Sequence, residues 1–575
     1  MAWLLENLPI PLRTALVHGS EGAGHLARCA GLAAGAGLGR LAGELLLAAW
    51  AESPLDAGLA GQAAGLEGAS AAARVLAAHV AEHSAAPAEL SYYRRLVSRR
   101  DLPKIRVYLI RQGEKEPGNL FWDRLSLAHA LEAEDWDWAA RVSARLPEPL
   151  ARILNGDAAM FRRDAAQALA EYSRAMRLWE CPGIEARLGM AHLLALDQET
   201  FLPISSGPPM EVPKPRHDLA HTHLAPEYEC PGHEAQAARW LLAGLEREPW
   251  RTQTLLALYD LLFGRRGMRR APEGRVEALL YTYNKAQDID STLASLFASN
   301  LGETRVTVLD NGGTDATADV LAAWRERTCP DRLRTVSLPV NVGAPAARNW
   351  LASLPQVRES DWAVFLDDDV SLPPDWLTLL GAAARLYPGA GVWGARVLDH
   401  SRPTHIQSAD VFLIAPPAHG AGHGAEPGVD ANRPDSRRFT LSSCHHQTLD
   451  RGQFAYVRPC ATVTGCCHLF RTKTLASMGG FDLRYSPSQY DDLDHDIRLL
   501  LAGVTPVCQG HLAVGHLKST GGQGGVGQSQ YGVGFANQYK LHQKFDAECF
   551  RRAARLADET AWEDALAKWR DVASL

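Results

Sequence analysis

Short strand-like runs alternate with helical patterns in the second half of this chain, and this alternation constrains its fold most. The runs lie at Val276–Tyr281, Arg305–Leu309, Trp362–Leu366 and Val392–Val397. Strands that alternate with helices are typical of α/β domains built on a mostly parallel sheet. Before about residue 270, Ala, Leu, Arg and Trp recur at helical spacing and β-branched runs are few. We therefore predict an all-α region followed by an α/β domain.

The length of the chain requires more than one hydrophobic core. At 575 residues, two to four domains are expected. A basic, glycine-containing segment at 263–270, followed by Ala271-Pro272, marks the main boundary. We predict a helical N-terminal region (1–95), a helical repeat domain (96–268), an α/β domain (274–525) and a helical tail (526–575).

Two helical segments of the first half carry small residues on one face and a proline beyond it. They are Ala168, Tyr172 and Ala175 before Pro182, and Ala237, Leu241 and Gly244 before Pro249. Small residues let paired helices approach closely, and proline ends a helix. The arrangement resembles the second helix of tetratricopeptide repeats. A generic helical bundle is the alternative, because small residues at this spacing are also common in helical cores.

The net charge and the cysteines limit the kinds of partner and the cellular compartment that we expect for this protein. The formal charge of −7 gives no basic field, so we do not expect nucleic acid as a partner. Ten scattered cysteines fit a reducing compartment. The opening of the chain lacks a signal-peptide pattern, and no early apolar stretch is long enough to span a membrane. We expect a cytoplasmic protein with at most peripheral membrane contact. The sequence does not decide whether the protein forms a homo-oligomer.

A group of cysteines and histidines in the second half raises the question of zinc. It comprises Cys444, His445, His446, Cys460, Cys466 and Cys467. The group lacks the paired CxxC spacing of structural zinc sites, so zinc is not favoured there.

Three consecutive carboxylates, Asp367, Asp368 and Asp369, directly follow the apolar run Trp362–Leu366. The run reads as a buried strand that ends where the chain must turn. Three adjacent acids repel one another unless a cation lies beside them, and a divalent ion that bridges to phosphate oxygens would supply that charge. An acidic surface turn is the alternative.

Polar residues also follow the first two apolar runs. Thr282 and Asn284 follow the first, and Asp310 and Asn311 follow the second, before Gly312-Gly313. Open α/β sheets bind ligands at the carboxyl ends of their strands. The carboxylate of Asp310 can accept a hydrogen bond from a nucleobase, and the glycines let the backbone approach a ribose.

Further charged residues follow along the chain. Arg348, in a loop that begins near Gly343, can contact a diphosphate or hold the loop of the second strand. Asp491 and Asp492 fall at the predicted start of a helix, where backbone N–H groups favour negative charge. Asp494 lies one helical turn before Arg498, at a spacing that allows an ion pair.

In chain order these segments read YTYN, VLDNGGTD, NVGAPAARN, FLDDDV, GGFD, YDDLDHDIR and VGHLKS. This order resembles family 2 glycosyltransferases of the GT-A fold, over roughly residues 275–520. The resemblance implies an inverting, metal-dependent transfer of a sugar to an acceptor hydroxyl. It implies a nucleoside diphosphate donor, expected to be a UDP-sugar, and Mn²⁺ or Mg²⁺ as cofactor.

The resemblance also implies roles for individual donor-site residues. Asp369 and His516 would bind the metal, and Asp367 would hold the ribose or the metal. The other residues expected to bind the nucleotide are Thr282, Asn284, Asp310, Asn311, Gly343, Arg348 and Asp368.

For the acceptor, the resemblance points to the acidic pair. Asp492 is the expected base and Asp491 would orient the acceptor, while Asp494 would be structural. The family often has Glu-Asp at this pair, so which of the two acids is the base stays open. Tyr281 stands where proline is usual, and we expect this difference to matter little.

Three assignments have alternatives. His511 could replace His516 as a metal ligand, and Lys518 could contact the diphosphate or be solvated. The glycine run at 521–525 could be a lid over the nucleotide or only a linker.

Three functions compete for the acceptor side. The helical half would present a protein or peptide acceptor, since repeat arrays offer concave peptide-binding surfaces. Alternatively the acceptor is a saccharide or lipid-linked glycan and the helices serve dimerisation. A binding scaffold with a defunct site is disfavoured by the intact acidic residues and the late histidine. We expect a protein or peptide, by analogy with transferases that pair such repeats with a catalytic domain.

Overall fold

The computed structural model describes residues 6–179, 182–200, 232–329, 331–415, 438–442, 445–517 and 528–575. Within these residues the first part of the chain forms helices, and the first strand begins at Val276. The helices are α2 (Ile10–His18), α3 (Ala23–Gly35), α4 (Gly39–Glu52), α5 (Ala57–Ala64), α6 (Ala71–Glu82), α7 (Ser91–Ser98), α8 (Leu102–Lys115), α9 (Leu120–Glu132), α10 (Trp136–Ser143), α11 (Glu148–Phe161), α12 (Ala165–Leu178), α13 (Pro182–Thr200), α15 (His233–Arg247) and α16 (Thr252–Leu262).

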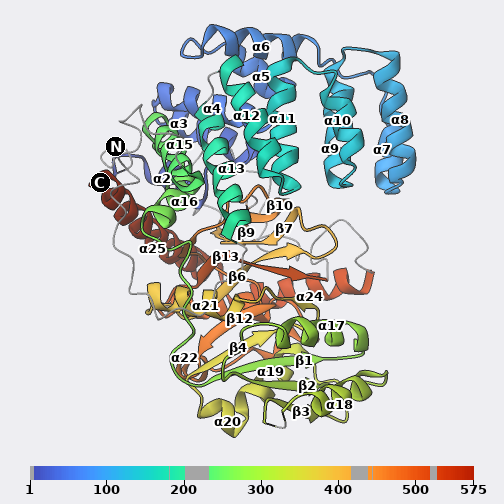
Figure 1. The fold of residues 1–575 in the computed structure, drawn as a ribbon, viewed down its shortest axis with the longest axis vertical. Helices are drawn as coiled ribbons and strands as arrows, with labels where there is room; N and C mark the ends of the chain where they lie inside the picture. Colours follow the sequence, from blue (N-terminus) through green and yellow to red (C-terminus); the bar gives the residue numbers. More distant parts are fainter. Residues whose placement is uncertain are drawn as a thin grey trace.

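Helices α3 to α15 pack side by side as an array over one end of the sheet (Figure 1). Glycines set the distance between its paired helices. A Cβ on Gly156 of α11 would lie 2.3 Å from the Tyr172 ring of α12, and one on Gly189 of α13 would lie 2.6 Å from Leu241 of α15. The small-residue faces predicted for α12 and α15 are buried. The all-α region is thus confirmed, and its likeness to tetratricopeptide repeats stays a prediction.

The second part contains a mixed sheet whose strand order is β10-β7-β6-β12-β4-β1-β2-β3. Strands β3, β2, β1 and β4 run parallel, and β12 joins β4 to β6 antiparallel to β4. The strands are β1 (Val276–Thr282), β2 (Arg305–Asp310), β3 (Leu333–Ser337), β4 (Trp362–Leu366), β5 (Val370–Ser371), β6 (Trp393–Asp399), β7 (His405–Ser408), β10 (His446–Leu449), β11 (Val457–Pro459), β12 (Cys467–Arg471) and β13 (Val507–His516), with β8 (Leu413–Ile414) and β9 (Thr440–Leu441) in a separate pair.

The predicted α/β class is confirmed, and all four predicted strands are present. Helices cover both faces of the sheet, because β1 and β4 bury apolar side chains on either side. These helices are α17 (Ala286–Phe297), α18 (Thr317–Arg327), α19 (Ala344–Ser353), α20 (Pro355–Arg358), α21 (Trp376–Leu386), α22 (Thr472–Ser477), α23 (Asp491–Leu501), α24 (Gln528–Lys544) and α25 (Ala547–Ala573). No helix of the described residues is both long and apolar enough to cross a membrane.

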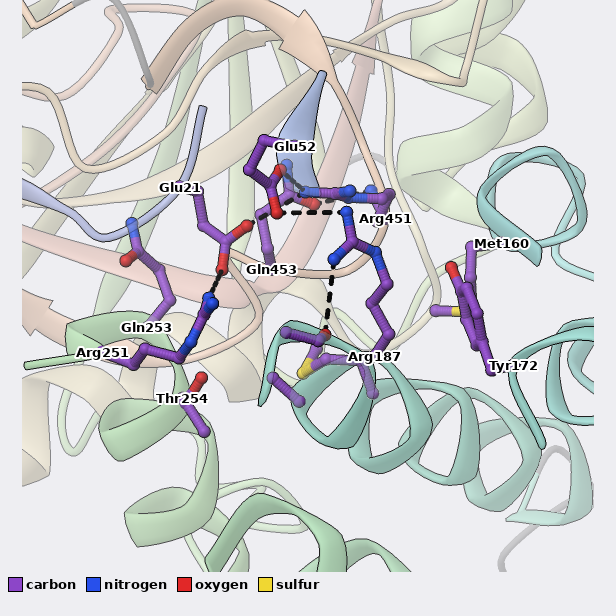
Figure 2. A pocket seen from close by; sticks show the side chains of 13 residues that line it. Glu21, Glu52, Met160, Tyr172, Arg187, Arg251, Gln253, Thr254, Arg451 and Gln453 are labelled. Carbon is purple, nitrogen blue, oxygen red and sulfur yellow. Dashed lines mark hydrogen bonds and ion pairs between the residues drawn. The ribbon is translucent and has the colours of Figure 1, made fainter. Parts of the chain in front are cut away.

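Arg451, in the loop after β10, ties the α/β part to the helical array (Figure 2). Its guanidinium lies 3.0 Å from Glu21, 2.5 Å from Glu52 and 3.5 Å from Asp157. Burial alone would raise the pKa of Glu52, but Arg451 and Arg187 lower it to about 2. The three acids come from the helical part, so the contact is a buried ion network between the two parts.

Helix α25 adds a second connection. The Trp569 indole N–H donates to the Pro249 carbonyl (3.1 Å) after α15, and the Lys568 ammonium donates to the Val457 carbonyl (2.8 Å) of β11. The C-terminal helix therefore packs against both parts.

Candidate active site

The parallel strands bring the predicted polar residues to one edge of the sheet. Thr282 at the end of β1 pairs with Asp310 at the end of β2, and Leu280 of β1 pairs with Leu366 of β4. Asp367 therefore lies beside β1, and the Tyr281 hydroxyl donates to its Oδ1 at 3.3 Å. The acidic run thus faces the loops that follow β1 and β2.

His516, at the end of β13, completes a three-residue ligand set with Asp367 and Asp369. One ligand atom from each lies within 4.8 Å of the others. The His516 Nε2 is 3.1 Å from Asp369 Oδ1 and 3.8 Å from Asp367 Oδ2. Two carboxylates and an imidazole are a donor set that suits Mn²⁺.

A neighbour of His516 determines the tautomer of its ring, and so which ring nitrogen carries the proton and which faces the carboxylates with a lone pair. The Gln407 amide N–H donates to the His516 carbonyl, so its Oε1 faces the ring and accepts from Nδ1–H at 2.8 Å. The buried Nε2 is therefore unprotonated in the neutral ring and has no hydrogen-bond partner among the residues that the structure describes. An unprotonated nitrogen and a carboxylate oxygen 3.1 Å apart repel each other unless a proton or a metal ion lies between them. The residues present thus fit a divalent metal ion.

Lys285, just after β1, neutralises part of the acidic run. Its ammonium is 2.9 Å from Asp368 and 2.6 Å from Asp369. Burial raises the pKa of Asp368 to about 6, although Lys285 opposes the rise. Burial would also raise the pKa of Asp369, but His516, when its ring is protonated, and the Lys285 ammonium together hold it well below the usual range. Asp369 is therefore an ionised carboxylate with cationic or metal-binding neighbours.

Arg348 of α19 is buried between the two acidic groups of the site. Its guanidinium is 2.6 Å from Asp491 and 3.2 Å from Asp367, and it donates to the Gly465 carbonyl at 3.1 Å. The rings of Tyr281 and Phe481 lie 5.4 Å and 5.2 Å from it, within cation–π range. Tyr281 therefore contributes contacts to this site, although we expected it to matter little.

The two acids at the start of α23 lie in different environments. Asp491 is buried against Arg348; burial raises its pKa to about 6 against the charge of Arg348, and Asp492 adds to the rise. Asp492 is half-buried, and its carboxylate accepts from the backbone N–H groups of Gly465 (2.9 Å) and Leu493 (2.8 Å). Of the two acids, Asp492 is the one open to an incoming molecule.

The residues expected to bind the nucleoside line the loops after β1 and β2. Asp310 accepts from the Gly313 N–H at 2.8 Å, and Asn284 accepts from the Thr314 N–H at 2.7 Å. Asn311 accepts from the Val342 N–H at 3.0 Å. These bonds tie the loops after β1 and β2 to each other and to the loop before α19.

Two further residues of this set lie close by. Gly343 precedes α19 with a φ of +83°, and a Cβ there would lie 2.9 Å from Ser486 Oγ, so the position requires glycine. Thr282 is buried beside Asp368.

Other residues singled out in the sequence lie elsewhere. His511 contacts Asp260 of α16 at 2.8 Å rather than the acidic run. Asp494 pairs with Arg498 at 3.0 Å, as its spacing predicted. Cys460, Cys466 and Cys467 are buried free thiols. Cys444, Lys518, the glycine run 521–525 and the side chain of His446 lie outside the described residues.

Sequence reasoning missed two residues of this site. Lys285 directly follows the YTYN segment, and its place after a strand was a usable signal for a cation beside the acids. Gln407 of β7 had no such signal, because only the pairing of β7 with β6, and of β6 with β13, brings it to His516.

Comparisons with known proteins match the second part of the chain. Residues 278–473 match the family model described as glycosyl transferase family 2. The N-acetylglucosaminyl-diphospho-decaprenol L-rhamnosyltransferase of Mycobacterium tuberculosis, found in two strains, is 27% identical over 230 residues. That match covers 39% of this chain and 69% of the relative.

Two solved structures show more distant likenesses. One is a crystal structure of GalNAc-T7 with UDP, GalNAc and Mn²⁺, with a TM-score of 0.36 and 9% identity, covering 61% of this chain and 62% of that one. The other is the mannosyltransferase PcManGT from Pyrobaculum calidifontis in complex with GDP-Man and Mn²⁺, with a TM-score of 0.31 and 18% identity, covering 59% and 86%. The family match and the described geometry agree: this chain contains a family 2 glycosyltransferase domain, preceded by an all-helical region.

Proposed function

We propose that this domain is an inverting, metal-dependent glycosyltransferase that uses a nucleoside diphosphate sugar, expected to be a UDP-sugar. The observation that carries the proposal is the convergence of Asp367, Asp369 and the unprotonated Nε2 of His516. Arg348 links Asp367 of this group to Asp491, the chain neighbour of the half-buried Asp492. One side of the site thus suits a metal and a diphosphate, and the other suits an acceptor.

On the donor side, Asp369, His516 and Asp367 would hold Mn²⁺ or Mg²⁺. A bound divalent ion stabilises the negative charge that develops on the departing diphosphate. The Lys285 ammonium adds positive charge at the same place, 2.6 Å from Asp369. The nucleoside would lie against Thr282, Asn284, Asp310 and Asn311, with Gly343 shaping the neighbouring loop.

On the acceptor side, Asp492 would accept the proton of the attacking hydroxyl. General-base assistance of this kind contributes about 10²–10⁴-fold to the rate. Asp491 is buried and bonded to Arg348, so it acts as a positioning residue that fixes this guanidinium between the two halves of the site. In this assignment Arg348 organises the carboxylates and does not itself grip the diphosphate.

A protein or peptide is the first candidate for the acceptor. A cavity of about 310 Å³ lies between the helical array and the loop around β10. Leu127 of α9, Leu154 of α11 and Leu449 of β10 line it, together with Arg124 and Asp157. Apolar and charged groups facing one cavity suit a side chain of a polypeptide.

A lipid-linked glycan is the second candidate. The relative from Mycobacterium tuberculosis is named for transfer to N-acetylglucosaminyl-diphospho-decaprenol. If this chain used the same class of acceptor as that relative, the glycan would have to reach Asp492 without entering the cavity between the helical array and the loop around β10.

The donor assignment is tested by thermal unfolding with Mn²⁺ and a panel of nucleotide sugars, followed by donor hydrolysis. We expect stabilisation by a UDP-sugar that requires Mn²⁺. Stabilisation by other nucleotide sugars alone would overturn the UDP assignment, and metal-independent hydrolysis would overturn the metal assignment.

The acceptor assignment is tested by Leu154→Arg, which places a charge in the cavity. We expect this variant to lose transfer to a protein acceptor while it keeps donor hydrolysis. Leu178→Arg, at an exposed position on α12, is the matched control. Unchanged transfer to the protein by Leu154→Arg would show that this cavity does not bind the acceptor, and transfer to a lipid-linked glycan but to no protein would favour the second candidate.

A further inference from the structure

The helical hairpin α7–α8 concentrates positive charge at one end of the array. Helix α7 packs on α8, and α8 packs on α9. Figure 1 shows the hairpin at the end of the array farthest from α3 and α15. Residues 91–111 contain seven basic side chains and one acidic side chain, a net charge of +6 in a chain whose total is −7. The hairpin is therefore a basic segment in an acidic protein.

Most of this charge faces solvent and lacks an acidic partner among the described residues. Within the part of the chain that the structure describes, the exposed arginines without an ion pair are Arg94, Arg95, Arg99, Arg100 and Arg111. Lys104 is paired with Asp101 at 2.6 Å, and Arg106 is paired with Asp135 at 2.9 Å. Unpaired arginines gathered on one hairpin attract a polyanionic partner.

Apolar side chains are exposed among these arginines. Tyr92 is 47% exposed, Val97 39%, Leu102 41% and Val107 50%. On α8, Lys104, Val107 and Arg111 stand three and four residues apart and so share one face. Tyr92 and Arg95 of α7 and Arg99, directly after it, have the same spacing, and the Tyr92 ring packs on Tyr108 of α8 at 5.3 Å. Each helix thus presents a row in which an apolar side chain lies between or beside basic ones.

We propose that the α7–α8 hairpin docks this protein onto an anionic lipid bilayer. Basic residues near a membrane surface are drawn to anionic headgroups, and exposed aliphatic and aromatic side chains enter the headgroup boundary. Nucleic acid explains the charge but leaves Val97, Leu102 and Val107 without a role. The mixture of charge and aliphatic groups therefore favours lipid.

The docking surface is separate from the sugar-transfer site and does not depend on the proposed donor or acceptor. None of its residues contacts the acidic run or His516 in the described structure. Docking would bring the transferase to a membrane whichever acceptor it uses, whether a membrane-associated protein or a lipid-linked glycan.

The test is co-sedimentation of the full chain with vesicles of phosphatidylcholine alone or with about 30% phosphatidylserine. We expect binding to the anionic vesicles only, and weaker binding at high salt. The triple variant Arg95→Gln, Arg99→Gln, Arg111→Gln should bind on the order of a hundredfold more weakly, because each basic residue near the surface contributes about a factor of five. Arg177→Gln, Arg239→Gln, Arg325→Gln removes as much charge from exposed positions elsewhere and should bind like the unaltered protein.

A second variant separates lipid from other polyanions. Val107→Ser keeps the charge and, at a half-exposed position, should leave the fold intact. We expect it to weaken vesicle binding at high salt, where the apolar contribution dominates. Failure of the unaltered chain to bind anionic vesicles would overturn the proposal. The proposal would also be overturned if Val107→Ser left vesicle binding unchanged and the unaltered chain bound RNA as tightly as it binds vesicles.

Discussion

At the scale of residues, Arg348 links the two chemical halves of the site. It is buried between Asp367 and Asp491 and lies between two aromatic rings. Removing one partner of a buried ion pair leaves an uncompensated charge, which costs about 3–5 kcal/mol.

We expect Arg348→Met to lower the free energy of unfolding by that amount and to abolish transfer, because Asp491 and Asp367 lose their shared cation. Chemical denaturation measures the first effect and donor turnover the second. Arg358→Met, at an exposed position on α20, should change stability by less than about 0.5 kcal/mol. Equal stability of the two variants would contradict the role of Arg348.

Gln407 is a positioning residue for His516. Loss of the partner that orients a ligating histidine typically weakens metal binding by about 10–100-fold. We expect Gln407→Leu to show such a loss in a Mn²⁺ titration, with little change in donor affinity at saturating metal. Gln453→Leu, at a buried glutamine away from the acidic run, serves as control. A Mn²⁺ affinity unchanged in Gln407→Leu would show that His516 is held by other contacts.

Much of the site was predictable at this scale, and the reason is local. Thr282, Asp310 and Asp367 each follow an apolar strand run directly, so their place at the sheet edge follows from sequence order. The contacts of Gln407 and Arg348 could not be predicted in this way, because their partners His516 and Asp491 lie 109 and 143 residues away along the chain. Contacts between such distant segments depend on strand order, which a single sequence does not encode in a local pattern.

At the scale of elements, the same contrast between local and distant signals explains which strands could be predicted from the sequence. The strands β1, β2, β4 and β6 are buried along almost their whole length, because helices cover both faces of the sheet. Strand β13 alternates buried and half-buried residues over its second half and contains polar groups, so it was not predicted. Strands β7 and β10 are four residues long, too short for a periodic signal.

The helical array makes a prediction about close packing. Gly189 of α13 lies so near Leu241 of α15 that no Cβ fits without a shift. We expect Gly189→Val to destabilise the protein by about 1–3 kcal/mol through overpacking. Gly31→Ala, in α3 with open space around it, should instead be neutral or stabilising by up to about 1 kcal/mol. Similar effects of the two substitutions would contradict the close approach of α13 and α15.

At the scale of the whole molecule, the buried network around Arg451 joins the helical and α/β parts. Burial and the charge of Glu52 raise the pKa of Glu21 to about 6, although Arg451 and Arg251 oppose the rise, so Glu21 depends on these arginines to stay ionised. Removing Arg451 would leave Glu21, Glu52 and Asp157 without their shared partner.

We expect Arg451→Met to cost about 3–5 kcal/mol and to split the unfolding of the chain into two transitions, one for each part. Scanning calorimetry detects the split, and tryptophan fluorescence checks it with a second probe. A single transition at an unchanged temperature would show that other contacts, such as those of α25 and of Arg163 with Asp450, are enough to join the parts.

The proposed sugar transfer depends on a metal site made by Asp367, Asp369 and His516. Its most direct test is a Mn²⁺ titration, followed by electron paramagnetic resonance, of the unaltered chain, Asp369→Asn and Asp492→Asn. We predict that Asp492→Asn binds Mn²⁺ and donor normally but loses transfer, while Asp369→Asn loses Mn²⁺ binding and Mn²⁺-dependent donor binding together. Mn²⁺ binding by Asp369→Asn with unchanged affinity would contradict the central claim.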